Sequence, residues 1–209
     1  AGLKRPSAVL CGPVRQDRDD ALPGYLEMSD GTVFVGSIYM TRDKRLKLED
    51  RKADGDVRQR EIPLRAVKQI QCHVDKEWME KEWRFKETTV DEKLYTGRTY
   101  PARLYSHTLT LQDGRTLTGP LAEIVYVQPF ASREGPRADN PVPEPQRFLL
   151  HKRDKGAVGA DLKSLLYVRL IRLGEDAVEE GRQKAQKQAA KSASQTKGRL
   201  PKKPSAARP

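Results

Sequence analysis

The segment from His151 to Gly159, HKRDKGAVG, places four basic or histidine side chains beside two glycines. Cationic side chains next to flexible backbone amides are groups that bind phosphate and other anions. The spacing departs from the GxxxxGK[ST] pattern of nucleotide-binding P-loops. We therefore predict a candidate site for an anion or a nucleic acid here, and a solvated hairpin tip is the alternative. The residues of this candidate site are His151, Lys152, Arg153 and Lys155.

The C-terminal tail concentrates positive charge. Residues 181–209 contain nine Lys or Arg and no acidic residue, whereas residues 1–180 contain 31 basic and 29 acidic residues. The net charge of +11 is therefore mainly a property of the tail. Such a run attracts nucleic acid, an acidic wall polymer or an anionic membrane surface by counterion release, although a merely solubilising tail is the alternative. The tail residues that we expect to contact such a partner are Lys184, Lys187, Lys191, Lys197, Arg199, Lys202 and Lys203.

Residues suited to catalysis or metal binding are few and scattered. The three histidines, His73, His107 and His151, lie far apart in the sequence, and no CxxC, HExxH or GxSxG pattern occurs. His107 has the same strand parity as Leu109, which predicts a core or edge histidine. The sequence therefore predicts neither an enzyme nor a bound metal or cofactor.

The two cysteines and the first residue leave the cellular compartment open. Cys11 and Cys72 either form a disulfide, as in an exported protein, or remain two free thiols. Secretory leaders are cleaved before small residues such as Ala1, so export and a cytoplasmic location are both compatible with the sequence. No run of about 18 apolar residues is present, so we expect no transmembrane segment.

A repeated motif indicates how the chain is organised. LEMSDGTVFVG, residues 26–36, and LTLQDGRTLTG, residues 109–119, each contain two alternating apolar runs joined by Asp-Gly. This pattern predicts two β-hairpins with type I′ turns. The glycines at the ends of the motifs, Gly36 and Gly119, predict a strongly bent second strand.

Each motif begins a unit of five short strands. In residues 23–74 the strands are expected at 25–29, 32–41, 45–49 and 57–62, followed by a 3₁₀ turn at Leu64, Val67 and Ile70 and a last strand. In residues 102–174 they are expected at 103–112, 115–118, 123–128 and 147–151, and Leu162, Leu165 and Val168 repeat the same spacing. The predicted fold class is therefore mainly β, with two tandem small barrels.

Other segments connect or flank these units. Residues 1–22 are expected to form an N-terminal arm, and residues 132–146 a proline-rich loop inserted in the second barrel. Residues 75–101 fit a helix stripe or an extended hairpin; alternation of Trp83 with Phe85 favours the hairpin, with Trp78 and Trp83 as packing anchors. In the last segment, 175–209, a short helix is expected to give way to disorder from residue 181.

Residues 26–50 resemble the first motif of Sm-like proteins. Asp30-Gly31, Phe34, Gly36 and Ile38 fall at the expected offsets, and Asp43 comes one residue late. The second unit matches at Asp113, Gly114, Leu117, Gly119 and Leu121. The resemblance implies a small SH3-like or Sm-like β-barrel in each unit. It does not imply the family's uridine pocket, because Lys47 stands near the position of its Asn and no Arg-Gly pair occurs before Ile70.

Together these features predict a non-enzymatic binding or scaffold protein that a cationic tail tethers to an anionic polymer or surface. A protein partner on the barrels is compatible with this prediction. The alternative is a nucleic-acid-binding protein, in particular an RNA-binding one, whose barrels make the contact.

Overall fold

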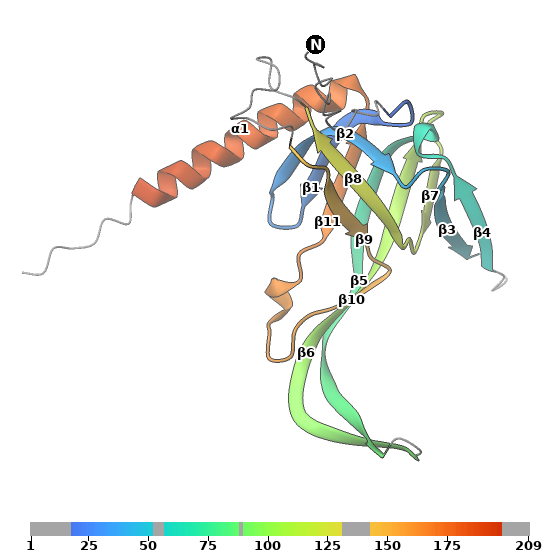
Figure 1. The fold of residues 1–209 in the computed structure, drawn as a ribbon, viewed down its shortest axis with the longest axis vertical. Coiled ribbons are helices and arrows are strands. Elements are labelled where there is room, and N and C mark those ends of the chain that lie inside the picture. Colours follow the sequence, from blue (N-terminus) through green and yellow to red (C-terminus); the bar gives the residue numbers. More distant parts are fainter. Residues whose placement is uncertain (1–17, 52–56, 88–89, 131–142, 198–209) are drawn as a thin grey trace, which may run out of the picture.

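The computed structural model of the chain describes residues 18–51, 57–87, 90–130 and 143–197. These residues are mainly in β-strands, as predicted, and one α-helix follows the last strand (Figure 1). Residues 1–17 of the expected N-terminal arm, with Cys11, and residues 131–142 of the proline-rich loop lie outside the described part. The elements are β1 (Leu22–Met28), β2 (Val33–Met40), β3 (Leu46–Arg51), β4 (Val57–Ile62), η1 (Leu64–Ala66), β5 (Val67–Glu87), β6 (Val90–Leu111), β7 (Thr116–Gly119), β8 (Glu123–Pro129), β9 (Gln146–Leu150), β10 (Arg153–Lys155), η2 (Leu162–Ser164), β11 (Val168–Leu173) and α1 (Glu175–Lys197).

The described strands do not form two separate closed barrels. One antiparallel sheet has the strand order β10-β6-β5-β11-β1-β2-β8-β9, and β7 pairs with β6 beside it. Strands β3 and β4 form a second, two-stranded sheet. Strands from the two predicted units therefore alternate within one open sheet.

The first hairpin of each half pairs with strands of the other half. The hairpin β1–β2 pairs on one side with β11 and on the other with β8, both from the C-terminal half. The hairpin β6–β7 pairs with β5 from the N-terminal half, and the chain just after β7 meets β3 through a bridge between Leu48 and Leu121. Apolar alternation determines which face a strand buries but not which strand lies beside it, so the sequence pattern is compatible with either pairing.

Buried side chains of both halves consequently share one hydrophobic core. Leu26, Ile38 and Leu48 from the first half pack in the same cluster as Leu109, Val125 and Ile171 from the second. At about 25 cal/mol per Å² of buried apolar surface, this shared core is the main stabilising contribution and binds the halves into one unit.

Gly36 and Gly119 permit close approach of backbones rather than only a bend. A Cβ atom on Gly36 would lie 2.2 Å from the carbonyl oxygen of Gln128 in β8. A Cβ atom on Gly119 would lie 2.1 Å from the carbonyl oxygen of Glu49 in β3. Both contacts join strands of different halves, so these glycines serve the contacts between the halves.

The two Asp-Gly hairpins form, but their turns are not type I′. A type I′ turn needs positive φ at both central residues, and of each Asp-Gly pair only the glycine, Gly31 or Gly114, has it. In the first turn the N–H of Gly31 donates to the Met28 carbonyl, and the N–H of Met28 donates to the Thr32 carbonyl. The second turn has the same two bonds. Both are three-residue loops with a G1 bulge, in which the Asp carboxylate accepts a hydrogen bond two residues onward.

The remaining local predictions comprise two confirmations and one correction. The 3₁₀ turns η1 and η2 lie where the three-residue spacing predicted them. Residues 75–101 are an extended hairpin, because β5 and β6 pair from Val67–Leu111 out to Glu87–Val90. The expected disorder from residue 181 is wrong up to residue 197, since α1 continues without interruption through that segment; residues 198–209 lie outside the described part.

Candidate anion-binding site

The segment predicted to bind an anion is not a free hairpin tip. Residues 153–155 form β10, which pairs with β6 so that Arg153 lies opposite Leu104 and Lys155 opposite Ala102. The backbone from residue 153 onward is therefore committed to the sheet. His151 and Lys152 occupy the short connection between β9 and β10.

Two cations of this segment, Lys152 and Arg153, form ion pairs with carboxylates. The Lys152 ammonium lies 2.8 Å from a Glu49 carboxylate oxygen. The Arg153 guanidinium donates to Glu80 at 2.6 Å and lies 5.5 Å from the Trp78 ring centroid. These contacts hold the segment against β3 and β5, and because both pairs are partly exposed each contributes about 1 kcal/mol or less to stability.

Lys155 is held more weakly. Its ammonium lies 5.5 Å from the ring centroid of Tyr100, a cation–π contact at an exposed site. Trp78 packs under Arg153 and so contributes to anchoring the segment, whereas Trp83 lies further along the hairpin.

A cleft of about 380 Å³ lies beside this segment and adds two cations that sequence reasoning missed as site residues. These cations are Lys44 and Lys47 from the β2–β3 region, and His151 lines the cleft beside them. Neither lysine makes an ion pair within the described residues. The cluster of four basic residues between 42 and 47 is the sequence signal that could have identified the two lysines. The residues lining the cleft are Met40, Thr41, Lys44, Lys47, Ala122, Glu123, Ile124, Leu149, Leu150, His151, Lys152 and Arg153.

One carboxylate limits what the cleft accepts. Glu123 lines the same wall, and its carboxylate accepts a hydrogen bond from the Lys47 backbone N–H at 3.3 Å. Its negative charge repels an incoming anion, and apolar residues such as Ile124 and Leu149 line the rest of the cleft. The cleft therefore suits one small anionic group better than a long polyanion.

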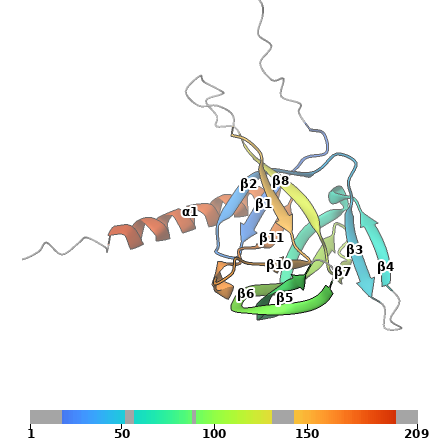
Figure 2. The ribbon, with the colours of Figure 1, turned by 60° about the horizontal axis from the view of Figure 1, so that its bottom comes forward.

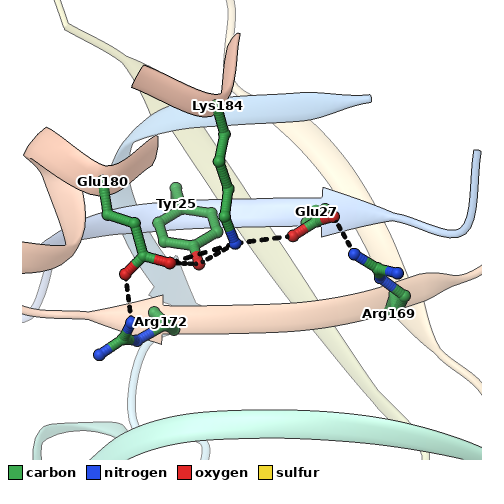
Figure 3. A network of polar contacts seen from close by, with 6 residues as sticks. All are labelled: Tyr25, Glu27, Arg169, Arg172, Glu180 and Lys184. Atoms are coloured by element: carbon green, nitrogen blue, oxygen red, sulfur yellow. Dashed lines mark hydrogen bonds and ion pairs between the residues drawn. The ribbon is translucent and has the colours of Figure 1, made fainter. Parts of the chain in front are cut away.

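The second group of predicted cations begins on α1, and the first of them is engaged in a polar network on the sheet (Figure 3). The Lys184 ammonium donates to the Tyr25 hydroxyl at 2.8 Å and lies 3.2 Å from Glu27 and 3.1 Å from Glu180. Burial lowers the pKa of Lys184, but the hydrogen bonds to Tyr25 and to the two carboxylates outweigh this effect and raise it. Lys184 is therefore a docking residue of the helix and is not available to a polyanion.

The carboxylate at the centre of this network is buried. The Glu27 side chain is only 7% exposed and lies between Lys184 and Arg169. Arg172 pairs with Glu180 at the other end of the network, as Figure 3 shows. Two cations, Arg169 from β11 and Lys184 from α1, thus compensate the burial of Glu27.

The other predicted tail cations differ from Lys184. Lys187 makes no ion pair within the described part of the chain. Lys191 lies four residues later in α1, on the same face of the helix, and Lys197 is its last residue. Arg199, Lys202 and Lys203 lie outside the described residues.

The histidine and the cysteine that face each other in the sheet are poorly suited to nucleophilic catalysis. Cys72 and His107 are opposite residues of β5 and β6. Burial, and then the charge of Asp75, raises the pKa of Cys72 to about 12, so the thiol stays protonated. His107 is 1% exposed, and neither ring nitrogen has a hydrogen-bond partner. Burial, with a smaller effect of His73, lowers its pKa to about 4.

The described residues contain neither a metal-binding cluster nor a membrane-spanning helix. No group of three or more His, Cys, Asp or Glu side chains in the described residues is arranged to hold a metal ion. The one helix of that part lacks the length and apolar character needed to cross a bilayer.

Comparison of the chain with protein-family models, with curated proteins and with solved structures gave no match.

Proposed function

We propose that this protein is a non-enzymatic binding or scaffold protein, held on an anionic polymer or surface by the basic part of α1 and the residues that follow it. The observation that carries this proposal is the division of charge along α1. Its first six residues include four carboxylates, and from residue 181 to the end of the chain every charged residue is basic. The acidic end docks on the sheet, and the basic end projects from it (Figure 2).

The composition of the projecting part supports an electrostatic rather than a packed contact. Alanine, glutamine, lysine and serine recur on all sides of the helix after residue 184, so no apolar stripe requires a protein surface to cover it. Cations on a solvated helix bind polyanions by releasing condensed counterions, without reading a sequence. Nucleic acid, an acidic wall polymer and an anionic membrane surface share this chemistry.

The test is neutralisation within the full chain. A variant with glutamine at Lys187, Lys191, Lys197, Arg199, Lys202 and Lys203 keeps Lys184 and therefore keeps the helix docked. We expect its affinity for a labelled duplex DNA and for vesicles containing phosphatidylserine to fall by at least about a hundredfold at low salt. Unchanged affinity for both would contradict the proposal.

A matched control removes the same number of charges elsewhere. Six exposed basic residues of the body are replaced by glutamine, and this variant should lose much less affinity because its net charge changes equally but its helix does not. These residues are Arg42, Arg58, Arg65, Lys68, Lys81 and Lys163. Equal losses in the two variants would attribute binding to net charge alone.

A second candidate function is binding of an anion by the body, and the cleft beside His151 favours it. Because Lys152 and Arg153 are paired with carboxylates, the cations left for a ligand are Lys44 and Lys47. This candidate predicts that glutamine at both lysines weakens binding of a small anion, inorganic phosphate, by about tenfold or more even when the tail cations are already neutralised. No further loss in that background would exclude it.

We also propose that each half is related to a small Sm-like or SH3-like barrel, with the first hairpins exchanged between the halves. The support is that β1–β2 lies between β11 and β8, while β6–β7 lies between β5 and β3, so the two hairpins have equivalent neighbours. An experimental structure in which β2 pairs with β3 would contradict the exchange.

A further inference from the structure

The hairpin formed by the outer parts of β5 and β6, which we call the arm (residues 75–101), projects from the body of the protein (Figure 1). Its base is supported, because β10 pairs with β6 at residues 102–104. Beyond the base, neither strand of the arm has a further strand beside it within the described residues. An isolated two-stranded hairpin is at best marginally stable in water, so an arm of this length gains stability from a partner that covers it.

The tip of the arm carries an aromatic cluster on one face. Trp83 lies opposite Tyr95, and Phe85 lies opposite Lys93, so all four side chains share a face. The rings of Trp83 and Phe85 meet edge to face at 5.0 Å, and the Lys93 ammonium lies 4.4 Å from the Trp83 ring centroid. Phe85 is 51% exposed and Tyr95 is 64% exposed. The cluster is therefore ordered by its own contacts and open on its outer side.

The charges of the tip exclude a polyanion as the preferred occupant. Residues 81–95 contain four basic and four acidic residues, in a chain whose net charge is +11. Two ion pairs join the strands of the arm, Glu82 with Arg98 at 2.9 Å and Lys86 with Glu92 at 3.0 Å. A tip with no net charge and internally paired ions offers a nucleic acid no counterion release.

We propose that this aromatic face binds the same face of a second copy of the chain, forming a two-fold symmetric dimer through the arm tips. The positive charge of the chain lies mainly in residues 181–209, whereas the arm tip has no net charge, so two tips approach each other without charge repulsion. One strand of the arm covers thirteen residues, 75–87, or about 40 Å, which exceeds the Debye length of about 8 Å at physiological salt several times. The basic part of α1 lies away from the arm (Figure 1), so the basic helices of the two copies stay apart while identical aromatic faces pack in an isologous contact.

The experiment is sedimentation equilibrium of the full chain at concentrations up to about 100 μM, a range that detects dimers of micromolar affinity. We expect a monomer–dimer equilibrium in the native protein and a dissociation constant raised at least tenfold in the variant Phe85→Ser/Tyr95→Ser. The control is Leu166→Ser, which removes an apolar side chain that is 52% exposed and lies outside the aromatic cluster of the tip. It should dimerise like the native protein.

Three results would overturn the proposal. First, the native protein could remain monomeric over the whole concentration range. Second, the arm variant could dimerise as tightly as the native protein. Third, the arm variant could lose nucleic-acid binding while its own oligomeric state is the same as that of the native protein. The last result would mean that the tip binds nucleic acid. Circular dichroism of each variant verifies that it is folded, which is expected because both substituted side chains are exposed.

An optical measurement tests the same contact independently. In the variant Trp78→Phe, Trp83 is the remaining tryptophan. Burial of its ring between two tips should shift its emission to shorter wavelength as the protein concentration rises through the dimerisation range. An emission maximum that does not depend on concentration would contradict the proposed face.

Discussion

At the residue scale, two of the buried polar side chains, Glu27 and His107, differ in their partners. Two cations, Lys184 and Arg169, lie against the Glu27 carboxylate. His107 has neither a charged partner nor a hydrogen bond to its ring nitrogens. Burial of an unpaired imidazole favours its neutral form, so the two residues should respond differently to pH and to substitution.

His107 predicts a loss of stability in mild acid. Its pKa is about 4 in the folded chain and about 6.5 when unfolded. Between these values the unfolded chain takes up a proton that the folded chain refuses, so the free energy of unfolding falls as pH drops from about 6.5 to 4. At about 1.4 kcal/mol per pKa unit, the loss from this residue is about 3 kcal/mol.

The measurement is urea unfolding at neutral pH and at about pH 4.5, where most of the loss has occurred. His107→Leu should remove most of this acid loss, and at neutral pH it should cost little because the ring nitrogens it deletes were unpaired. His73→Gln, at an exposed position of the neighbouring strand, should keep most of the native pH dependence, because burial and not the charge of His73 is the main cause of the lowered His107 pKa. An unchanged pH profile in His107→Leu would show that the folded protein accommodates the imidazolium.

Lys184 predicts a loss of helix docking. Lys184→Met keeps the aliphatic stem but removes the ammonium that joins Tyr25, Glu27 and Glu180. We expect a destabilisation of about 1 to 3 kcal/mol, the range for hydrogen bonds to charged groups. Amide exchange in residues 177–188 should accelerate as well. Lys187→Met, which removes an unpaired cation one turn later, should leave both quantities unchanged; equal effects in the two variants would refute the docking role.

At the residue scale, the sequence could not predict which cations form ion pairs in the folded protein. The cations of the segment 151–155 were identifiable by type, but their partners Glu49 and Glu80 lie in strands distant in the chain. A basic cluster indicates where charge is available and not whether folding neutralises it. Lys184 was misassigned for the same reason, because its carboxylate partner Glu27 belongs to the first strand.

At the scale of elements, local patterns predicted the strands, both hairpins and both 3₁₀ turns. Each depends on neighbours in sequence: alternation sets the strand faces, and Asp-Gly sets the turn. The turn type was wrong because a three-residue loop with a G1 bulge uses the same dipeptide with only the glycine at positive φ. The predicted helix was too short, because Gly181 and the lack of apolar periodicity after it indicate the end of a helix. In the structure α1 continues through Lys197, and it docks on the sheet through polar residues, which leave no apolar periodicity in the sequence.

The glycine at the end of the second repeated motif gives a test of the contact between β7 and β3. In Gly119→Ala the new Cβ would lie 2.1 Å from the Glu49 carbonyl oxygen, so one of the two backbones must move. We expect a destabilisation of about 2 to 3 kcal/mol in urea unfolding. Gly97→Ala, which meets only open space but has a φ of 80°, should cost about 1 kcal/mol. A smaller cost at Gly119 than at Gly97 would contradict the close approach.

At the scale of the whole molecule, the order of strands was the feature that could not be predicted. Five strands per half fit two separate barrels as well as they fit one sheet with exchanged hairpins, because both arrangements bury the same residues on the same faces. The paired strands of the arm hold the end of the first half beside the start of the second, so the two halves lie next to each other.

The whole molecule also separates its charges. A body of nearly balanced charge carries a neutral arm on one side and a basic helix on another (Figures 1 and 2). If the arms dimerise and the helices bind a polyanion, one dimer presents two basic segments, and the second contact gains from the effective concentration set by the first.

The salt dependence of binding tests the central claim most directly. For the native chain and a duplex DNA, we expect the logarithm of the association constant to fall linearly with the logarithm of salt concentration, with a slope of about −5, as six released counterions require. A chemically unrelated polyanion, such as polyphosphate, should give a similarly steep dependence, and the variant with six glutamines should give a slope near zero. A shallow slope for the native chain, or a steep one that survives in that variant, would contradict tethering through the basic end of α1.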